Sequence, residues 1–92
     1  MNRKCFLCGR SESSYNPMEM HHIFGAAYRK KSTKYKLVVP LCHCCHNEPP
    51  EGVHHNIKNM RKLQRYGQRK VMREQGWSIE EFIQQFGRNY LE

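Results

Sequence analysis

The sequence predicts a small α+β domain with a metal-stabilised core and helices at its C-terminal end. Three observations carry this prediction: two Cys-x2-Cys pairs, two short strand-like segments between those pairs, and helical periodicity in the last third of the chain. Ninety-two residues make one domain with a limited core, and such domains often need a metal or a disulfide for stability. We therefore expect a single domain over 1–92, with the core at 1–56 and a helical extension at 57–92.

Two strands are expected in the core. Residues 11–17 are rich in Ser, Asn and Pro and predict a loop, after which residues 18–23 have the character of a short strand. The clearest strand is 36–41, which contains two adjacent valines and a proline near its end. Between the strands, 24–35 predict a basic loop. Residues 42–47 can begin a helix, which the prolines and glycine that follow would interrupt.

A long helix is expected from residue 56 to 75. Its apolar stripe recurs at spacings of three and four: Ile57, Met60, Leu63 or Gln64, Gly67 and Val71. Gly67 within this stripe indicates either a close approach of another segment or a weak point in the helix.

A last helix follows with clear end signals. Ser78 and Glu81 have the spacing of a capping box, while Trp77 and Phe82 occupy the two positions of a hydrophobic staple. Gly87 is expected to end the helix. Three of its apolar side chains are expected in the core: Phe82, Ile83 and Phe86.

The chain is strongly basic, with sixteen Lys and Arg residues against eight Asp and Glu and a net charge of +8. This excess favours a polyanionic partner, first of all nucleic acid, although a solvated basic surface without a partner is the alternative. The candidate phosphate contacts are Arg29, Lys30, Lys31, Lys58, Arg61, Lys62 and Arg65. No apolar run approaches the about 20 residues of a membrane span, and none forms a signal-peptide core. We therefore expect a soluble, cytoplasmic protein that does not bind a membrane.

The four cysteines at 5, 8, 42 and 45 predict a structural zinc site. Cys5-x2-Cys8 and Cys42-x2-Cys45 match the paired knuckles of a tetrahedral site with four thiolates. Two disulfides are the alternative, but they need an oxidising compartment that nothing in the sequence indicates. Cys44 permits a different pairing with Cys42; because the x2 spacing matches the first pair, Cys44 is expected to be a separate thiol.

The histidines indicate a second site beside the zinc. His21 and His22 are neighbours in the first predicted strand and would point to opposite faces, so that one buried and one exposed histidine is the plain alternative. His46 directly follows the second cysteine pair, and His54 and His55 come soon afterwards. Several imidazoles suit a divalent metal, and a neutral histidine nearby suits a general base acting on water. In a basic chain, this chemistry favours phosphodiester hydrolysis.

Taken in combination, these motifs resemble those of the HNH endonucleases, in particular small phage- and prophage-type HNH proteins. The matching segments are Cys-x2-Cys, Met-His-His-Ile, Leu-Val-Val-Pro-Leu-Cys-x2-Cys-His and Val-His-His-Asn, and the resemblance covers nearly the full length. It implies a treble-clef-like ββα-metal core with a four-cysteine zinc, DNA as the partner, and a phage-encoded or bacterial cytoplasmic protein. The activity it implies is metal-dependent nicking or cutting of DNA by hydrolysis.

The resemblance also implies roles for individual histidines. His21 and His46 would bind the catalytic divalent metal, which could be Mg²⁺, Mn²⁺, Ni²⁺ or Zn²⁺, and His22 would activate water. The family often places a further histidine one helical turn after the position of His46, where this chain has Pro50. We therefore expect the third ligand from the segment that follows, with His54 favoured over its neighbour at 55.

A second departure from the family pattern is the missing middle Asn, since the corresponding segment is Lys34-Tyr35-Lys36. Backbone groups or Tyr35 would then have to brace the loop before the second strand. This departure favours the alternative of a non-catalytic, zinc-stabilised DNA-binding module derived from the HNH fold. A protein-interaction module that uses the C-terminal aromatic residues is a third possibility, but a staple and a core already account for those residues.

Overall fold

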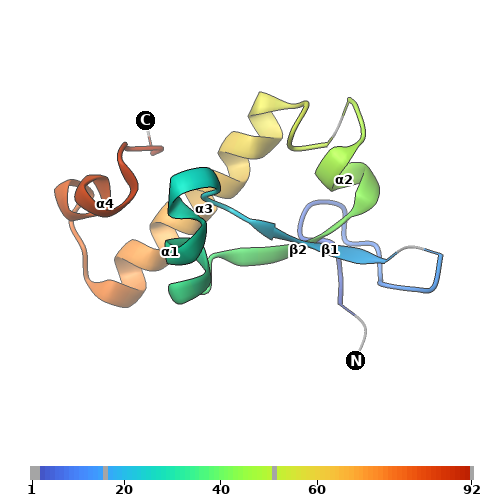
Figure 1. Ribbon diagram of the computed structural model, residues 1–92, viewed down its shortest axis with the longest axis horizontal. Coiled ribbons are helices and arrows are strands. Elements are labelled where there is room, and N and C mark those ends of the chain that lie inside the picture. Colours follow the sequence, from blue (N-terminus) through green and yellow to red (C-terminus); the bar gives the residue numbers. More distant parts are fainter. Residues whose placement is uncertain (1–2, 16, 51, 92) are drawn as a thin grey trace.

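The computed structural model describes residues 3–15, 17–50 and 52–91 (Figure 1). The elements follow one another as β1 (Met18–His22), the 3₁₀ helix η1 (Ala26–Tyr28), α1 (Arg29–Lys34), β2 (Val38–Cys42), α2 (His43–Asn47), α3 (Ile57–Gln75) and α4 (Ile79–Phe86). The predicted α+β class is confirmed: a two-stranded antiparallel sheet is accompanied by helices and by four clustered cysteines. No helix in these ranges is both long and apolar enough to cross a bilayer.

The two strands pair in a register that sets the positions of the site residues. Met18 lies opposite Cys42 and His22 lies opposite Val38, so β1 runs from the cysteine end of β2 towards its start. His21 is 4% exposed and points to the covered face. Pro40 is tolerated within β2 because both strands of a two-stranded sheet are edges.

The prediction of a loop over residues 24–35 is wrong, because η1 and α1 occupy most of this segment. Lys and Arg are good helix formers, so a basic composition does not by itself indicate a loop. The buried Ser32 ties α1 to the end of β1: its hydroxyl accepts a hydrogen bond from the Phe24 N–H (3.1 Å) and donates one to the Phe24 carbonyl (2.6 Å). Ser32 therefore braces the connection between the strands.

Helix α3 begins and ends close to the predicted residues. Asn56 caps its start by accepting a hydrogen bond from the Asn59 N–H. Of the two alternatives for Gly67, the structure supports the close approach, because a Cβ there would lie 3.0 Å from the Cγ2 atom of the Ile23 side chain. The prediction that Ile57 belongs to the buried stripe is wrong, because this side chain is 65% exposed in the first turn of the helix.

A buried glutamine on α3 holds the C-terminal segment in place. The Gln68 amide nitrogen donates to Asn89 Oδ1 (2.8 Å), and its oxygen accepts the Tyr90 N–H (2.7 Å). Because both polar ends of this fully buried side chain are satisfied, the residues after α4 are fixed against α3.

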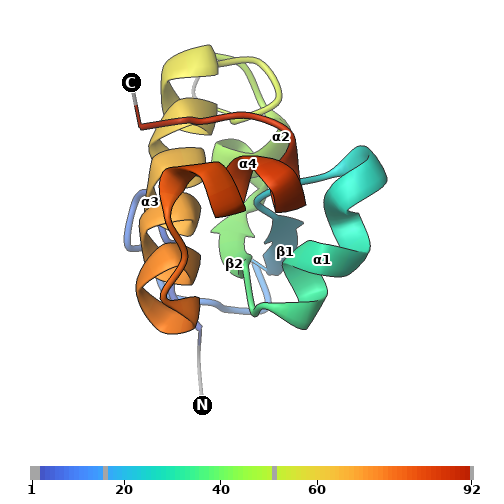
Figure 2. The same ribbon diagram turned by 90° about the vertical axis from the view of Figure 1, so that its left-hand side faces the viewer.

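Helix α4 has the predicted capping box and ends at Gly87, which adopts the left-handed conformation (φ 87°). Phe82 and Phe86 are buried as predicted and both rings contact Phe24. Ile83 is 38% exposed, contrary to the prediction, because the next residue along a helix points about 100° away from its neighbour. Figure 2 shows α4 closing one end of the molecule between α3 and α1.

Candidate functional site

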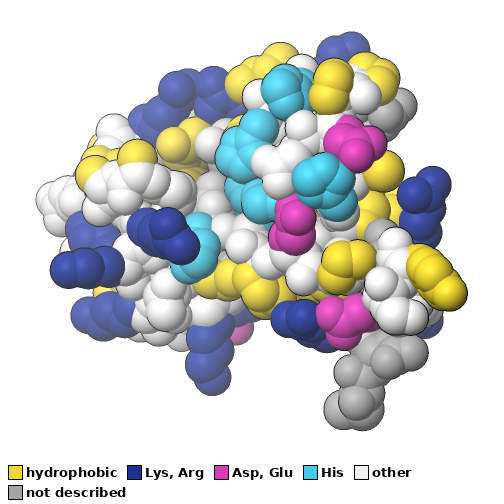
Figure 3. All heavy atoms as spheres, turned by 45° about the vertical axis from the view of Figure 1, so that its right-hand side comes forward, with side chains coloured by type: hydrophobic (Ala, Val, Ile, Leu, Met, Phe, Trp, Pro, Cys, Tyr) yellow, Lys and Arg dark blue, Asp and Glu magenta, His cyan; other side chains and the backbone are white. Residues whose placement is uncertain are grey.

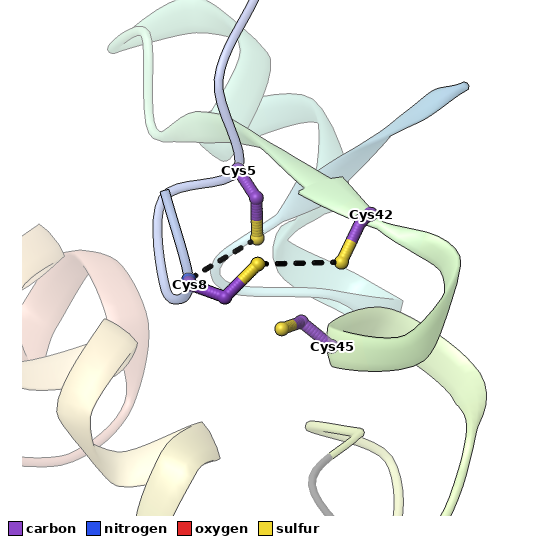
Figure 4. A group of neighbouring side chains, drawn as sticks. All are labelled: Cys5, Cys8, Cys42 and Cys45. Carbon is purple, nitrogen blue, oxygen red and sulfur yellow. Dashed lines mark hydrogen bonds between the residues drawn. The ribbon is translucent and has the colours of Figure 1, made fainter. Parts of the chain in front are cut away.

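The four cysteines of the two Cys-x2-Cys pairs converge on one point (Figure 4). Cys5 and Cys8 flank a turn near the N-terminus, Cys42 ends β2, and Cys45 lies in α2. Their sulfur atoms all lie within 4.8 Å of one another, and Cys8 Sγ and Cys42 Sγ are 3.6 Å apart. Tetrahedral zinc with Zn–S bonds of about 2.3 Å separates its sulfurs by about 3.8 Å. The cluster is therefore a possible metal site whose spacing fits a structural zinc.

Backbone groups stabilise one thiolate of this cluster. Burial alone would raise the pKa of the Cys5 thiol, but N–H groups of Cys8, Cys42 and Leu7 hold its thiolate, and its pKa falls to about 6. Burial and the neighbouring sulfurs raise the pKa of Cys45. The protein thus stabilises the thiolate of Cys5 and disfavours that of Cys45, whereas four thiolates together call for a cation.

Cys44 stays outside the cluster, as expected from its spacing. Its side chain is exposed and its thiol lies 3.5 Å from Glu48 Oε2.

Three histidines form a second group beside the cysteines: His21 from β1, His46 from α2 and His54 from the following turn. One ring nitrogen of each lies within 4.8 Å of the others, and the Nε2 atoms of His46 and His54 are 3.2 Å apart. Nitrogen ligands about 2.05 Å from a tetrahedral zinc are about 3.3 Å apart. Figure 3 shows histidine side chains gathered on one face with acidic side chains beside them.

His21 Nε2 is buried and has no hydrogen-bond partner among the described residues. A buried polar atom without a partner is costly, so such an atom calls for an explanation. Burial lowers the pKa of His21 to about 4, with further lowering by the charges of His46, His54 and His22. His21 is therefore neutral at pH 7, which is the form that binds a metal.

Backbone contacts explain how His54 reaches this group across the proline-containing insertion. The Val53 N–H donates to the Cys45 carbonyl (2.8 Å) and the His54 N–H to the His46 carbonyl (3.4 Å). Gly52 permits this return, because a Cβ there would lie 2.6 Å from the Glu48 carbonyl oxygen. The turn thus brings His54 into the group and leaves the neighbouring histidine at 55 outside it, although both side chains are exposed.

Glu19 is a site residue that the sequence did not reveal. Its Oε1 accepts a hydrogen bond from His46 Nδ1 (2.7 Å) and its Oε2 one from His43 Nδ1 (3.0 Å). The hydrogen bonds from these two histidines lower the pKa of Glu19. This contact favours the His46 tautomer with its proton on Nδ1, so that the lone pair of Nε2 faces His54; carboxylates have the same effect on metal-binding histidines. The only signal in the sequence was its position two residues before His21, on the same side of the strand.

The histidine group opens into a cleft of about 320 Å³ that is also lined by His22 and Arg29. His22 is half-buried, and burial together with the charge of Arg29 lowers its pKa. A neutral imidazole and a guanidinium thus face the same space as the histidine group.

The structure does not bring the predicted phosphate contacts onto one face. Of those in α1, Arg29 lines the cleft and Lys30 is exposed, whereas Lys31 Nζ donates to the Gln85 carbonyl (2.7 Å) and is thereby tied to α4.

On α3, the predicted contacts point in different directions. Arg61 lies over the Tyr90 ring and Arg65 donates to the Tyr90 carbonyl (3.3 Å). Lys58 is exposed in the first turn, and Lys62 lines a groove beyond the histidine cleft. The basic charge is therefore distributed around the helix.

No model of a known protein family matches the chain, and comparisons with curated sequences and with solved structures found no match either. The function is therefore inferred from the site residues themselves.

Proposed function

We propose that this protein is a metal-dependent endonuclease of the HNH type that hydrolyses phosphodiester bonds in DNA. The convergence of His21, His46 and His54 on a cleft that also holds His22 and Arg29 carries the proposal. A scaffold that only binds DNA has no need of a buried, unpartnered imidazole nitrogen. The net charge of +8 supports a polyanionic substrate.

Cys5, Cys8, Cys42 and Cys45 would hold a structural Zn²⁺ that embraces a ββα-metal fold formed by β1, β2 and α2. Metal bound by four thiolates contributes folding free energy that a small core lacks. It would also fix the junction of β2 and α2, which carries the histidine next to the last cysteine.

His21, His46 and His54 would hold the catalytic divalent metal, which when bound stabilises charge on the scissile phosphate and on the leaving oxygen. Glu19 keeps the proton of His46 on Nδ1 and so leaves Nε2 available. A neutral ring nitrogen of His22 takes the proton from the attacking water. Arg29 contacts the phosphate in the same cleft and positions the strand.

Ser32 can take over the role of the middle Asn, whose absence from this chain favours the non-catalytic alternative. The missing middle Asn would leave the connection after β1 without a side-chain brace, but the Ser32 hydroxyl makes two hydrogen bonds to the backbone of Phe24. This contact supports a catalytically competent position for His22, two residues earlier.

The test is cleavage of supercoiled plasmid at increasing concentrations of Mg²⁺, Mn²⁺ and Ni²⁺. His22→Ala should lose roughly 10²- to 10⁴-fold in rate while DNA binding is retained, because general base catalysis is worth about that much. His55→Ala is the matched control, since it removes an exposed imidazole that lies outside the cleft. Wild-type rates in His22→Ala, or metal-independent cleavage by the wild type, would refute the proposal.

A further inference from the structure

A second groove, of about 360 Å³, lies between the turn of the first cysteine pair and α3. Its apolar part is formed by Phe6 and Tyr66, whose ring centroids are 4.6 Å apart with the planes tilted by 53°. Phe6 is 39% exposed. Neither ring is needed for the histidine site, so the groove calls for an explanation of its own.

Cationic side chains of α3 complete this groove: Lys62, Arg69, Lys70 and Arg73. Lys70 forms an ion pair with Glu74 (3.0 Å), whereas no described carboxylate forms an ion pair with the other three. The exposed Phe6 ring and the half-buried Tyr66 ring, bordered by cations without ion pairs, are complementary to a ligand that is both flat and anionic. A nucleotide has this combination, since every base has a π-face and every linkage carries a negative charge.

The groove lies on the side of α3 opposite the histidine cleft. Met60 and Gln64 line the cleft, whereas Lys62 and Tyr66 line the groove. Lys62 comes two residues after Met60, and Tyr66 comes two residues after Gln64. Two residues correspond to a rotation of about 200° around an α-helix, so the two pairs face opposite sides. From Lys62 to Arg73 the helix rises about 16 Å, which is longer than the spacing of neighbouring phosphates in a strand.

The turn of the first cysteine pair holds one wall of the groove in place. Phe6 lies between Cys5 and Cys8, and its N–H donates to the Pro40 carbonyl in β2 (2.9 Å). The ring is therefore presented by a segment that is fixed at both ends, and little conformational entropy is lost when a base stacks on it.

We propose that this groove binds a single strand of DNA, with a base stacked on Tyr66 and Phe6 and the flanking phosphates contacted by Lys62, Arg69 and Arg73. The inference rests on the proposed function in one respect only: that function is the reason to prefer nucleic acid to an acidic polypeptide as the ligand. The groove is a contact apart from the cleft and would hold the strand away from the reacting phosphate.

The test measures binding by fluorescence anisotropy with labelled oligothymidylate and with an abasic strand of equal length. The protein carries its structural zinc, and no other divalent metal is added. The wild type should prefer the strand with bases. Tyr66→Leu should weaken binding of that strand roughly tenfold and leave the abasic strand unaffected, while Tyr66→Phe should retain the preference. Thermal unfolding checks that each variant is folded.

A pair of charge variants provides an independent check. Arg69→Gln/Arg73→Gln removes two cations from the groove, and Lys34→Gln/Arg88→Gln removes two exposed cations that do not line it. Only the first pair should weaken binding and reduce its salt dependence. The proposal would be overturned if the wild type bound oligothymidylate and the abasic strand with equal affinity, or if the two double variants had equal effects. Competition by polyglutamate that is as strong as competition by DNA would also overturn it. Because no cleavage is measured, a failure of the nuclease proposal would leave these results unchanged.

Discussion

The cysteine cluster and the histidine cluster meet at helix α2, where Cys45 and His46 are neighbours, but the two clusters differ in what surrounds them. Cys5, Cys42 and Cys45 are buried, and the four sulfurs face one another. The histidine cluster has one buried member and opens into a cleft. Structural metal sites are closed by protein ligands, whereas catalytic sites keep a position open to substrate. By this distinction the closed cysteine cluster suits a structural metal, and the open histidine cluster suits the catalytic role proposed for it.

The largest effect is expected from breaking the closed cluster. Cys45→Ser should abolish zinc binding and unfold the protein, because about 10–16 kcal/mol of apparent metal-binding free energy exceeds or matches the stability of a small domain. Cys44→Ser is the control, since it changes the adjacent, exposed thiol outside the cluster. Zinc content and circular dichroism should separate the two variants. A folded, zinc-free Cys45→Ser protein would show that the cysteines stabilise the fold in some other way.

A smaller effect is expected from changing Glu19, the hydrogen-bond partner of the histidine cluster. Glu19→Gln should weaken binding of the second metal by roughly 10- to 100-fold while the fold and the structural zinc are kept, since outer partners of metal ligands are worth about this much. Glu12→Gln is the control, because it makes the same change at a carboxylate that forms an ion pair with Arg3 (2.7 Å) and does not contact His46. Metal titration of both variants is the measurement. Equal affinities would mean that Glu19 does not orient His46.

The pH dependence of stability sharpens the contrast further. Below about pH 6.5 the unfolded chain takes up a proton that folded His21, with a pKa of about 4, does not accept. The free energy of unfolding should therefore decrease as the pH falls from 7 to 5, by about 2 kcal/mol from this residue. Urea unfolding of protein that carries one zinc ion per chain should show this loss, and His21→Gln should lack that part of it. A variant with the wild-type pH dependence would contradict the burial of a neutral His21.

Local signals were enough for several features of the fold. The spacing of the cysteine pairs predicted the cluster, and Ser78 with Glu81 predicted the start of α4, because these patterns depend on near neighbours in the chain. The histidine next to Cys45 could be placed near the cysteines for the same reason.

The remaining features depend on contacts between distant segments. Glu19 reaches His46 only through the register of β1 and the placement of α2, and Ser32 acquires its role only when α1 folds back on Phe24. Neither contact leaves a periodic pattern in the sequence. For the same reason composition could not reveal how the cations of α3 are distributed around the helix.

The most direct test of a second, open metal site is a calorimetric titration of the zinc-loaded protein with Ni²⁺. Wild type and His55→Ala should each bind one further ion per chain. His54→Ala should keep its zinc but lose affinity for the second ion by more than the roughly 10- to 100-fold expected for an outer partner. Uptake of no further ion by the wild type, or equal affinity in His54→Ala, would contradict the assignment of His21, His46 and His54 as a metal site.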